Sequence, residues 1–166
     1  MPLRQLSQED LIERFGDYRP FLKADGSISA AWEAKIIGTV VLPAPLPLSF
    51  LAGASVSRFK AHRLLVPRLT RAMAALHAEP EVWATINDFG GCYAWRRNRR
   101  DPSQLSTHCW AVAVDCDVHD NPQGRKGQVH PRAIEIFEGE GFLWGGRFHG
   151  ESVDPMHWEF ADLVNL

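Results

Sequence analysis

Two histidines and two aspartates in the second half of the sequence have side chains of the types that could form a catalytic metal site. His108 and Asp115 lie seven residues apart, and Asp154 and His157 lie three apart. Zinc accepts histidine nitrogen and carboxylate oxygen, and a catalytic zinc site keeps a fourth position for water. Three ligands and one acid that acts as a general base would account for these four residues. The competing interpretation is that each histidine is structural.

The spacing of His108 and Asp115 restricts where each of them can lie. On one regular strand an odd spacing points two side chains to opposite faces. We therefore expect His108 in a loop, which the preceding Ser106-Thr107 favours, ahead of a strand over residues 110–117. The strand face that carries Asp115 and Asp117 would otherwise hold alanines. Such small side chains leave room for a metal and a substrate, or equally for a packed helix.

Asp154 and His157 sit at the entrance to a second predicted strand, over residues 156–160. Pro155 keeps Asp154 in an extended conformation. His157 would begin the strand, and the aromatic residues after it would face the core. A histidine at the start of a strand, preceded by an acid in a fixed turn, suits one ligand and one general base.

The elements that must hold these residues follow from caps, prolines and hydrophobic periodicity. Ser7 and Asp10 resemble a capping box, and Gly16 can end the helix that they begin. Pro67 would kink or split the longest helical pattern. Helices early and strands late favour an α+β fold over a βαβ alternation. We predict helices over residues 8–15, 30–35, 57–76 and 131–140, a proline-rich extended segment over 40–50, and strands over 82–86, 110–117 and 156–160.

Length and charge limit the class of protein. The 166 residues suit one domain, and we expect a single domain over 1–166, with an N-terminal helical and proline-rich part over 1–54 and a catalytic core over 55–160. The net charge of −2 gives no field that would attract nucleic acid or a membrane surface. We therefore expect neither nucleic acid nor a membrane as partner. We also expect the protein to be a monomer.

The N-terminus and the cysteines bear on where the chain is made. The first fifteen residues lack the apolar region of a signal peptide, and three prolines within the apolar stretch over 36–54 exclude a membrane helix there. We expect synthesis in the cytoplasm. Cys92, Cys109 and Cys116 form no CxxC pair, so they favour buried thiols over a thiolate zinc site or a disulfide framework.

Four motifs in sequence order resemble those of one family. The segment STHCWAVAVD, over residues 106–115, resembles the SxHxxGxAxD signature of VanY-like zinc peptidases, the D-alanyl-D-alanine carboxypeptidases and L-alanyl-D-glutamate endopeptidases. DPMH over 154–157 is similar to the second signature, D/E-x-x-H. GFLWGG over 141–146 and GCYAWR over 91–96 are similar to two further family motifs. Ala111 stands where the family has glycine, a change that costs little unless that backbone needs a positive φ.

The resemblance implies a role for each residue. His108, Asp115 and His157 would be the zinc ligands, and Asp154 the catalytic base. Arg96 would contact the substrate carbonyl oxygen. The family fold is a small antiparallel sheet that carries the zinc site and packs against helices. In another register, Arg97 could replace Arg96, and His119, His130 or His149 could replace a ligand.

The resemblance further implies a zinc-dependent peptidoglycan peptidase that cleaves the stem peptide. GCYAWR and GFLWGG look closest to the L-alanyl-D-glutamate endopeptidases, acting as a single-domain phage endolysin that reaches the wall by holin-type release. A D-alanyl-D-alanine carboxypeptidase is the enzymatic alternative. A zinc-stabilised wall-binding module without turnover is the alternative from another class, and the presence of Asp154 and Arg96 argues against it.

Overall fold

The structure, a computed structural model, describes residues 3–162 and 164. Short 3-10 turns link the main elements: η1 (Arg19–Phe21), η2 (Thr107–Trp110), η3 (Gly145–Arg147) and η4 (Gly150–Ser152). The helices are α1 (Gln8–Phe15), α2 (Ala30–Ile36), α3 (Val66–Ala78), α4 (Pro80–Trp83) and α5 (Pro131–Gly139). The strands are β1 (Ile37–Pro47), β2 (Ser55–His62), β3 (Phe89–Gly91), β4 (Ala113–Cys116), β5 (Phe142–Trp144) and β6 (His157–Phe160).

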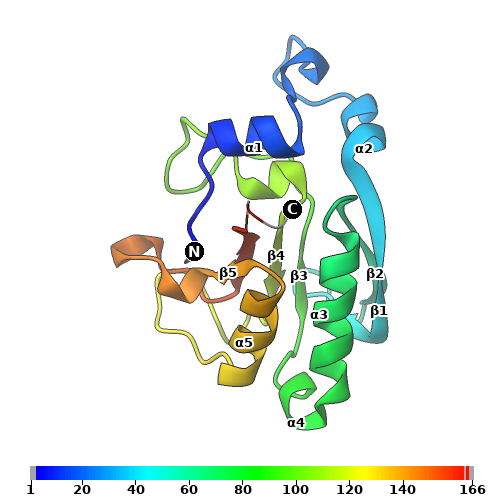
Figure 1. The fold of residues 1–166 in the computed structure, drawn as a ribbon, viewed down its shortest axis with the longest axis vertical. Coiled ribbons are helices and arrows are strands. Elements are labelled where there is room, and N and C mark those ends of the chain that lie inside the picture. The colour runs from blue at the N-terminus through cyan, green and yellow to red at the C-terminus, as the bar shows by residue number, and fades with distance from the viewer. Residues whose placement is uncertain (1–2, 163, 165–166) are drawn as a thin grey trace.

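Two small antiparallel sheets and the helices around them make up an α+β fold, which confirms the predicted class. β1 and β2 form a hairpin, and the other four strands form a sheet in the order β3-β4-β6-β5. In Figure 1, α3 and α5 lie side by side over this sheet, α1 crosses one end of it, and the hairpin flanks α3. The sheet therefore has one end under α1 and one face under helices.

The two faces of the four-stranded sheet differ in polarity because strand residues alternate in direction. On β6, Trp158 stacks on Phe137 of α5 with ring centroids 4.4 Å apart. Phe160 packs edge-on against Phe142 in the same core. The residues that alternate with them, His157 and Glu159, belong to the opposite face. The aromatic residues thus fix the helix-covered face and leave the other face to the polar side chains.

Several predicted elements are confirmed. Ser7 and Asp10 form a reciprocal capping box at the start of α1, and the backbone N–H of Gly16 closes that helix. The helix predicted over 30–35 is α2, and the one predicted over 131–140 is α5, with Pro131 in its first turn. The strand over 156–160 is β6. The three cysteines are free and buried.

The helix predicted over residues 57–76 is wrong in its first half. Residues 55–62 form β2, in which Phe59 and Ala61 alternate inward, and the helix begins only at Val66. Pro67 lies in the first turn, where its missing N–H costs nothing, so it starts α3 and does not kink it. The hydrophobic residues of this segment happen to recur at helical spacing. Its conformation is decided instead by pairing with β1.

Three other boundaries also differ from prediction. The strand predicted over 82–86 is wrong, since Pro80 begins the short helix α4 and turns follow it. The strand predicted over 110–117 is only β4, because Ala111 and Asp117 both have a positive φ. The proline-rich segment is extended as predicted, but it is the paired strand β1. Its register breaks between Val41 and Leu46.

Within the described residues, no helix combines the length and apolar character that a membrane crossing requires.

Candidate metal centre

The structure brings His108, Asp115 and His157 to one point from three different elements. His108 lies in η2, which is the turn ahead of the strand that the odd spacing requires. Asp115 on β4 is the direct cross-strand partner of His157 on β6. One ligand atom from each residue lies within 4.8 Å of the other two. Cross-strand pairing thus supplies two of the three candidate ligands, and a tight turn supplies the third.

His108 is oriented by the backbone of a neighbouring motif. Its Nδ1 donates to the carbonyl oxygen of Cys92 at 2.8 Å, which leaves Nε2 with a lone pair. Nε2 lies 3.3 Å from Asp115 Oδ2, yet it is buried and makes no hydrogen bond. An orphaned lone pair beside a carboxylate is costly unless a cation fills the space between them. The donor set and this orphan atom therefore fit a metal such as zinc.

His157 lies between two carboxylates. Its Nδ1 is 2.9 Å from Asp115 Oδ1, and its Nε2 is 3.1 Å from Glu159 Oε2. Burial alone would lower the pKa of His157, but the hydrogen bonds and charges of Asp115 and Glu159 raise that pKa to about 10. Burial alone would raise the pKa of Asp115, but His108 and His157 hold it well below its usual range. Asp115 is therefore a carboxylate, ready to bind a cation.

Asp154 lies beside this cluster in the turn before β6. One of its side-chain oxygens, Oδ1, is buried and has no hydrogen-bond partner. Burial raises the pKa of Asp154 to about 6. A carboxyl group with such a pKa can accept a proton near neutral pH and return it, as a general base requires.

The turn that carries Asp154 is held by the motif over residues 141–146. The backbone N–H of Asp154 donates to the carbonyl of Gly145 at 3.0 Å, and Trp144 Nε1 donates to Pro155 O at 2.7 Å. A Cβ at Gly145 would lie 2.3 Å from Asp154 O, so only glycine permits this approach. The placement of Asp154 thus explains why the motif has glycine at position 145.

Arg96 is half-buried at the edge of the same site. Its backbone N–H and carbonyl both contact the Cys109 thiol, at 3.3 and 3.1 Å. Because Cys109 follows His108 in η2, the arginine is fixed relative to that ligand. Arg97 points elsewhere and donates to Ser103 O at 3.2 Å. The structure thus places Arg96, and not Arg97, at the pocket.

A pocket of about 310 Å³ opens over the cluster. Asp115, Asp154 and His157 line its floor together with Glu159. The arginine loop, defined here as residues 96–105, forms one side. The N-terminal segment also contributes, through Gln5, Leu6 and Gln8. Sequence reasoning missed both Glu159 and this N-terminal wall. Glu159 could have been found, because it follows His157 by two residues and so shares its strand face.

The alternative histidines take other roles. His119 Nδ1 lies 2.6 Å from Asp88 Oδ2. His130 caps α5 by accepting from the backbone N–H of Arg132. His149 is exposed. Among the described residues, the metal-capable group contains none of these three.

Ala111 departs from the family pattern at a position where the backbone does need a positive φ. Its φ is 54° and its ψ 36°, the left-handed region that favours glycine. An L-residue there costs roughly 1–2 kcal/mol relative to glycine. Ala111 is fully buried, and its carbonyl accepts from the backbone N–H of His62 at 2.8 Å. The condition under which this alanine carries a cost is therefore met.

Comparison with known families matches residues 99–160, a little over a third of the chain, to a family model described as D-alanyl-D-alanine carboxypeptidase. The matched segment includes His108, Asp115, Asp154 and His157. Neither the curated proteins nor the solved structures include a match to this chain. The family match and the converging His-Asp-His group together make the chain an enzyme of the metallopeptidase class.

Proposed function

We propose that this metallopeptidase is a zinc-dependent peptidoglycan hydrolase, and that it cuts the stem peptide at the L-alanyl-D-glutamate bond. The observation that supports the assignment of a zinc peptidase is the convergence of three potential ligand atoms within 4.8 Å of one another, beside a carboxyl oxygen that is buried and has no hydrogen-bond partner. His108, Asp115 and His157 would hold the metal. When bound, zinc lowers the pKa of a water molecule toward about 7 and polarises a carbonyl group.

The chain's own residues supply the remaining chemistry. Asp154 Oδ1 is available to take a proton from the attacking water and return it to the leaving amine. The guanidinium of Arg96 would donate to the oxygen of the scissile carbonyl as negative charge develops there. Burial lowers the pKa of Arg96, but an arginine stays protonated in proteins, so its charge is retained. The pocket thus combines a base with an oxyanion donor.

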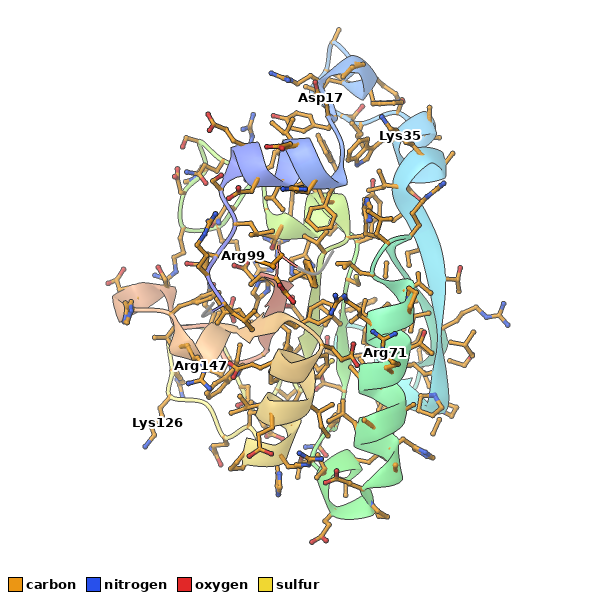
Figure 2. The ribbon with its side chains drawn as sticks, viewed as in Figure 1. Asp17, Lys35, Arg71, Arg99, Lys126 and Arg147 are labelled. Carbon is orange, nitrogen blue, oxygen red and sulfur yellow. The ribbon has the colours of Figure 1, made fainter. Side chains whose placement is uncertain are left out.

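The rim of the pocket suits an acidic peptide. Arg96, Arg99 and Arg100 all line it. Arg100 is paired with Glu151 at 3.2 Å, whereas Arg99 has no hydrogen bond or ion pair with any other residue that the structure describes. In Figure 2, Arg99 is labelled below α1, while Asp17 and Lys126 lie at the edge of the view. A free guanidinium at a peptide-sized pocket favours a substrate carboxylate, such as that of a γ-linked D-glutamate.

The D-alanyl-D-alanine carboxypeptidase is the second candidate, since the matching family model carries that description. The substrate of such an enzyme would also present a carboxylate to the arginine loop. Digestion of purified peptidoglycan, followed by mass spectrometry of the products, separates the two. New D-glutamate amino termini support the endopeptidase, and released D-alanine supports the carboxypeptidase.

The Asp154→Asn variant tests the mechanism. It should bind zinc like the wild type and lose activity by about 10²- to 10⁴-fold, because the base is removed and the ligands remain. Asp120→Asn, a neutralised carboxylate on the surface away from the pocket, is the matched control and should keep full activity. Wall digestion at the normal rate by Asp154→Asn would exclude this base. Full activity of a chelated, metal-free preparation would exclude zinc.

We further propose that the enzyme acts as an endolysin, made in the cytoplasm and released to the wall by a holin-type route. Host cells that express the chain alone should stay intact. They should lyse when a membrane-permeabilising agent is added, with turbidity as the measurement. Unchanged turbidity after permeabilisation, with active enzyme present, would argue against this role.

A further inference from the structure

The polar face of the four-stranded sheet holds a further buried carboxylate, that of Glu159, which the proposed mechanism does not use. Glu159 is buried, with a relative exposure of 4%. Among the described residues, its side chain has a single hydrogen-bond partner, Nε2 of His157 at 3.1 Å. A buried carboxylate is costly unless it is paired, so this contact is the main compensation for its burial.

The strand register explains why Glu159 reaches His157. Glu159 is opposite Ala113 on β4 and opposite Leu143 on β5, so its cross-strand neighbours are apolar. The small side chain of Ala113 leaves space for the carboxylate. His157 is two residues earlier on the same strand and therefore on the same face. The alanine beside Asp115 makes room for a glutamate, a use that the sequence pattern did not reveal.

Glu159 is placed as a partner of a ligand and not as a ligand itself. Within the described residues, the group of mutually close ligand atoms contains His108, Asp115 and His157 but not Glu159. His157 directs Nδ1 toward Asp115 and Nε2 toward Glu159. The two nitrogens thus face different neighbours, one at the metal centre and one behind it.

His108 shows the same arrangement with a different acceptor. Its Nε2 faces the centre, and its Nδ1 donates to the carbonyl of Cys92. Each histidine therefore has one nitrogen held from behind, in one case by a neutral carbonyl and in the other by a carboxylate. Such acceptors fix the tautomer and ring orientation of a ligating histidine, and a carboxylate also makes the ring a stronger electron donor.

We propose that Glu159 is a positioning residue for the metal centre: its carboxylate holds Nε2–H of His157 and so directs the Nδ1 lone pair of that ring at the metal. This rests on the proposed zinc site. Loss of an orienting partner of this kind weakens metal binding by about 10- to 100-fold. Glu159→Ala should show that loss. Glu159→Gln, which keeps an acceptor oxygen but no charge, should show a smaller one.

The test measures the zinc dissociation constant by competition with a chromophoric chelator, for the wild type, Glu159→Ala, Glu159→Gln and the control Glu151→Gln. Glu151 is an exposed carboxylate outside the pocket lining, so neutralising it should leave zinc affinity unchanged. A second readout is the Nε2–H proton resonance of His157 in the zinc-loaded protein. It should be slow to exchange in the wild type and in Glu159→Gln, and lost in Glu159→Ala.

The outcomes separate this proposal from the proposed function. If the wild type binds no zinc, the zinc site itself is wrong. If the wild type binds zinc and both Glu159 variants bind it equally well, Glu159 is not a positioning residue and the peptidase proposal stands. If Glu159→Ala does not fold, Glu159→Gln decides: weakened zinc binding with an unchanged unfolding midpoint of the metal-free protein supports the proposal, and unchanged zinc binding overturns it.

Discussion

The two sides of the pocket are built in different ways. The ligand wall, defined here as Asp115, His157 and Glu159 of the pocket floor together with His108, rests on a turn and two paired strands, and both histidines are held by a second bond. The opposite side is the arginine loop with α1 against it. Among the described residues, the guanidinium of Arg99 has no hydrogen-bond or ion-pair partner, and Gln8 is the one residue of α1 that bonds to the loop, through its side chain to Leu105 N and O at 3.2 and 3.0 Å.

Apart from Arg96, the proposed oxyanion donor, this difference separates chemistry from recognition. A metal centre needs its ligands held before the metal binds, which paired strands and buried hydrogen bonds provide. A surface loop tolerates change and can adapt to a substrate. The family match over residues 99–160 covers the ligand wall and most of the arginine loop, whereas α1 and Arg96 lie outside it. Variants on the two sides should therefore change different quantities.

The largest expected effect concerns the attachment of α1 to the core. His62 at the end of β2 lies with Nε2 3.2 Å from the carbonyl of Phe15, the last residue of α1, and its Nδ1 accepts from Leu64 N. Burial lowers the pKa of His62 from 6.5 to about 4. As the pH falls below 6.5, the unfolded chain binds the proton first, so stability declines until about pH 4, by up to about 3 kcal/mol.

Urea denaturation between pH 7 and 4 measures this effect. His62→Gln keeps a donor at the same place but cannot titrate, so its stability should fall less over that range. His77→Gln is the control, because His77 is an exposed histidine on α3. Parallel pH profiles of the wild type and His62→Gln would show that other groups cause the acid sensitivity.

The next effect concerns recognition by the arginine loop. Arg99→Gln should lower kcat/KM for a stem peptide by about 10- to 100-fold, mainly through KM, because a charge-assisted hydrogen bond to a carboxylate is lost. Its zinc affinity should not change. Arg97→Gln is the matched control, since Arg97 belongs to the same loop but does not line the pocket.

The chemistry of the substrate sharpens this test. Replacing Arg99 by glutamine should reduce the enzyme's activity only slightly when the substrate is a peptide whose D-glutamate α-carboxyl is amidated. An equal loss with amidated and free substrates would show that Arg99 does not bind that carboxylate, whatever the fate of the peptidase assignment.

The smallest expected effect concerns Gln8. Gln8→Ala removes both hydrogen bonds to Leu105, so the arginine loop should open more often. We expect KM to rise by about three- to tenfold, with kcat and zinc binding nearly unchanged, since one or two neutral hydrogen bonds contribute about 1 kcal/mol each. Hydrogen exchange at the Leu105 amide should quicken, and Glu9→Ala, an exposed neighbour, should change neither quantity. A lowered zinc affinity in Gln8→Ala would mean that the two sides of the pocket are coupled.

Much of the ligand wall could be predicted from local sequence. The odd spacing of His108 and Asp115 required a turn before the strand, and η2 is that turn. The capping box of α1, the first-turn proline of α5 and the alternation in β6 depend on neighbouring residues alone, so the pattern was sufficient. The roles of the ligands, of Asp154 and of Arg96 came from the motif resemblance and stay predictions.

Tertiary structure decided the rest, because the deciding contacts join residues that are distant in sequence. Pairing with β1 made a strand of residues 55–62, which local spacing assigned to a helix. The backbone at Ala111 needs a positive φ because the chain turns there into β4 while its carbonyl binds His62. The packing of α1 on the arginine loop made the N-terminal segment a wall of the pocket. Only the cross-strand register showed that Glu159 stands behind His157 and that Ala113 makes room for it.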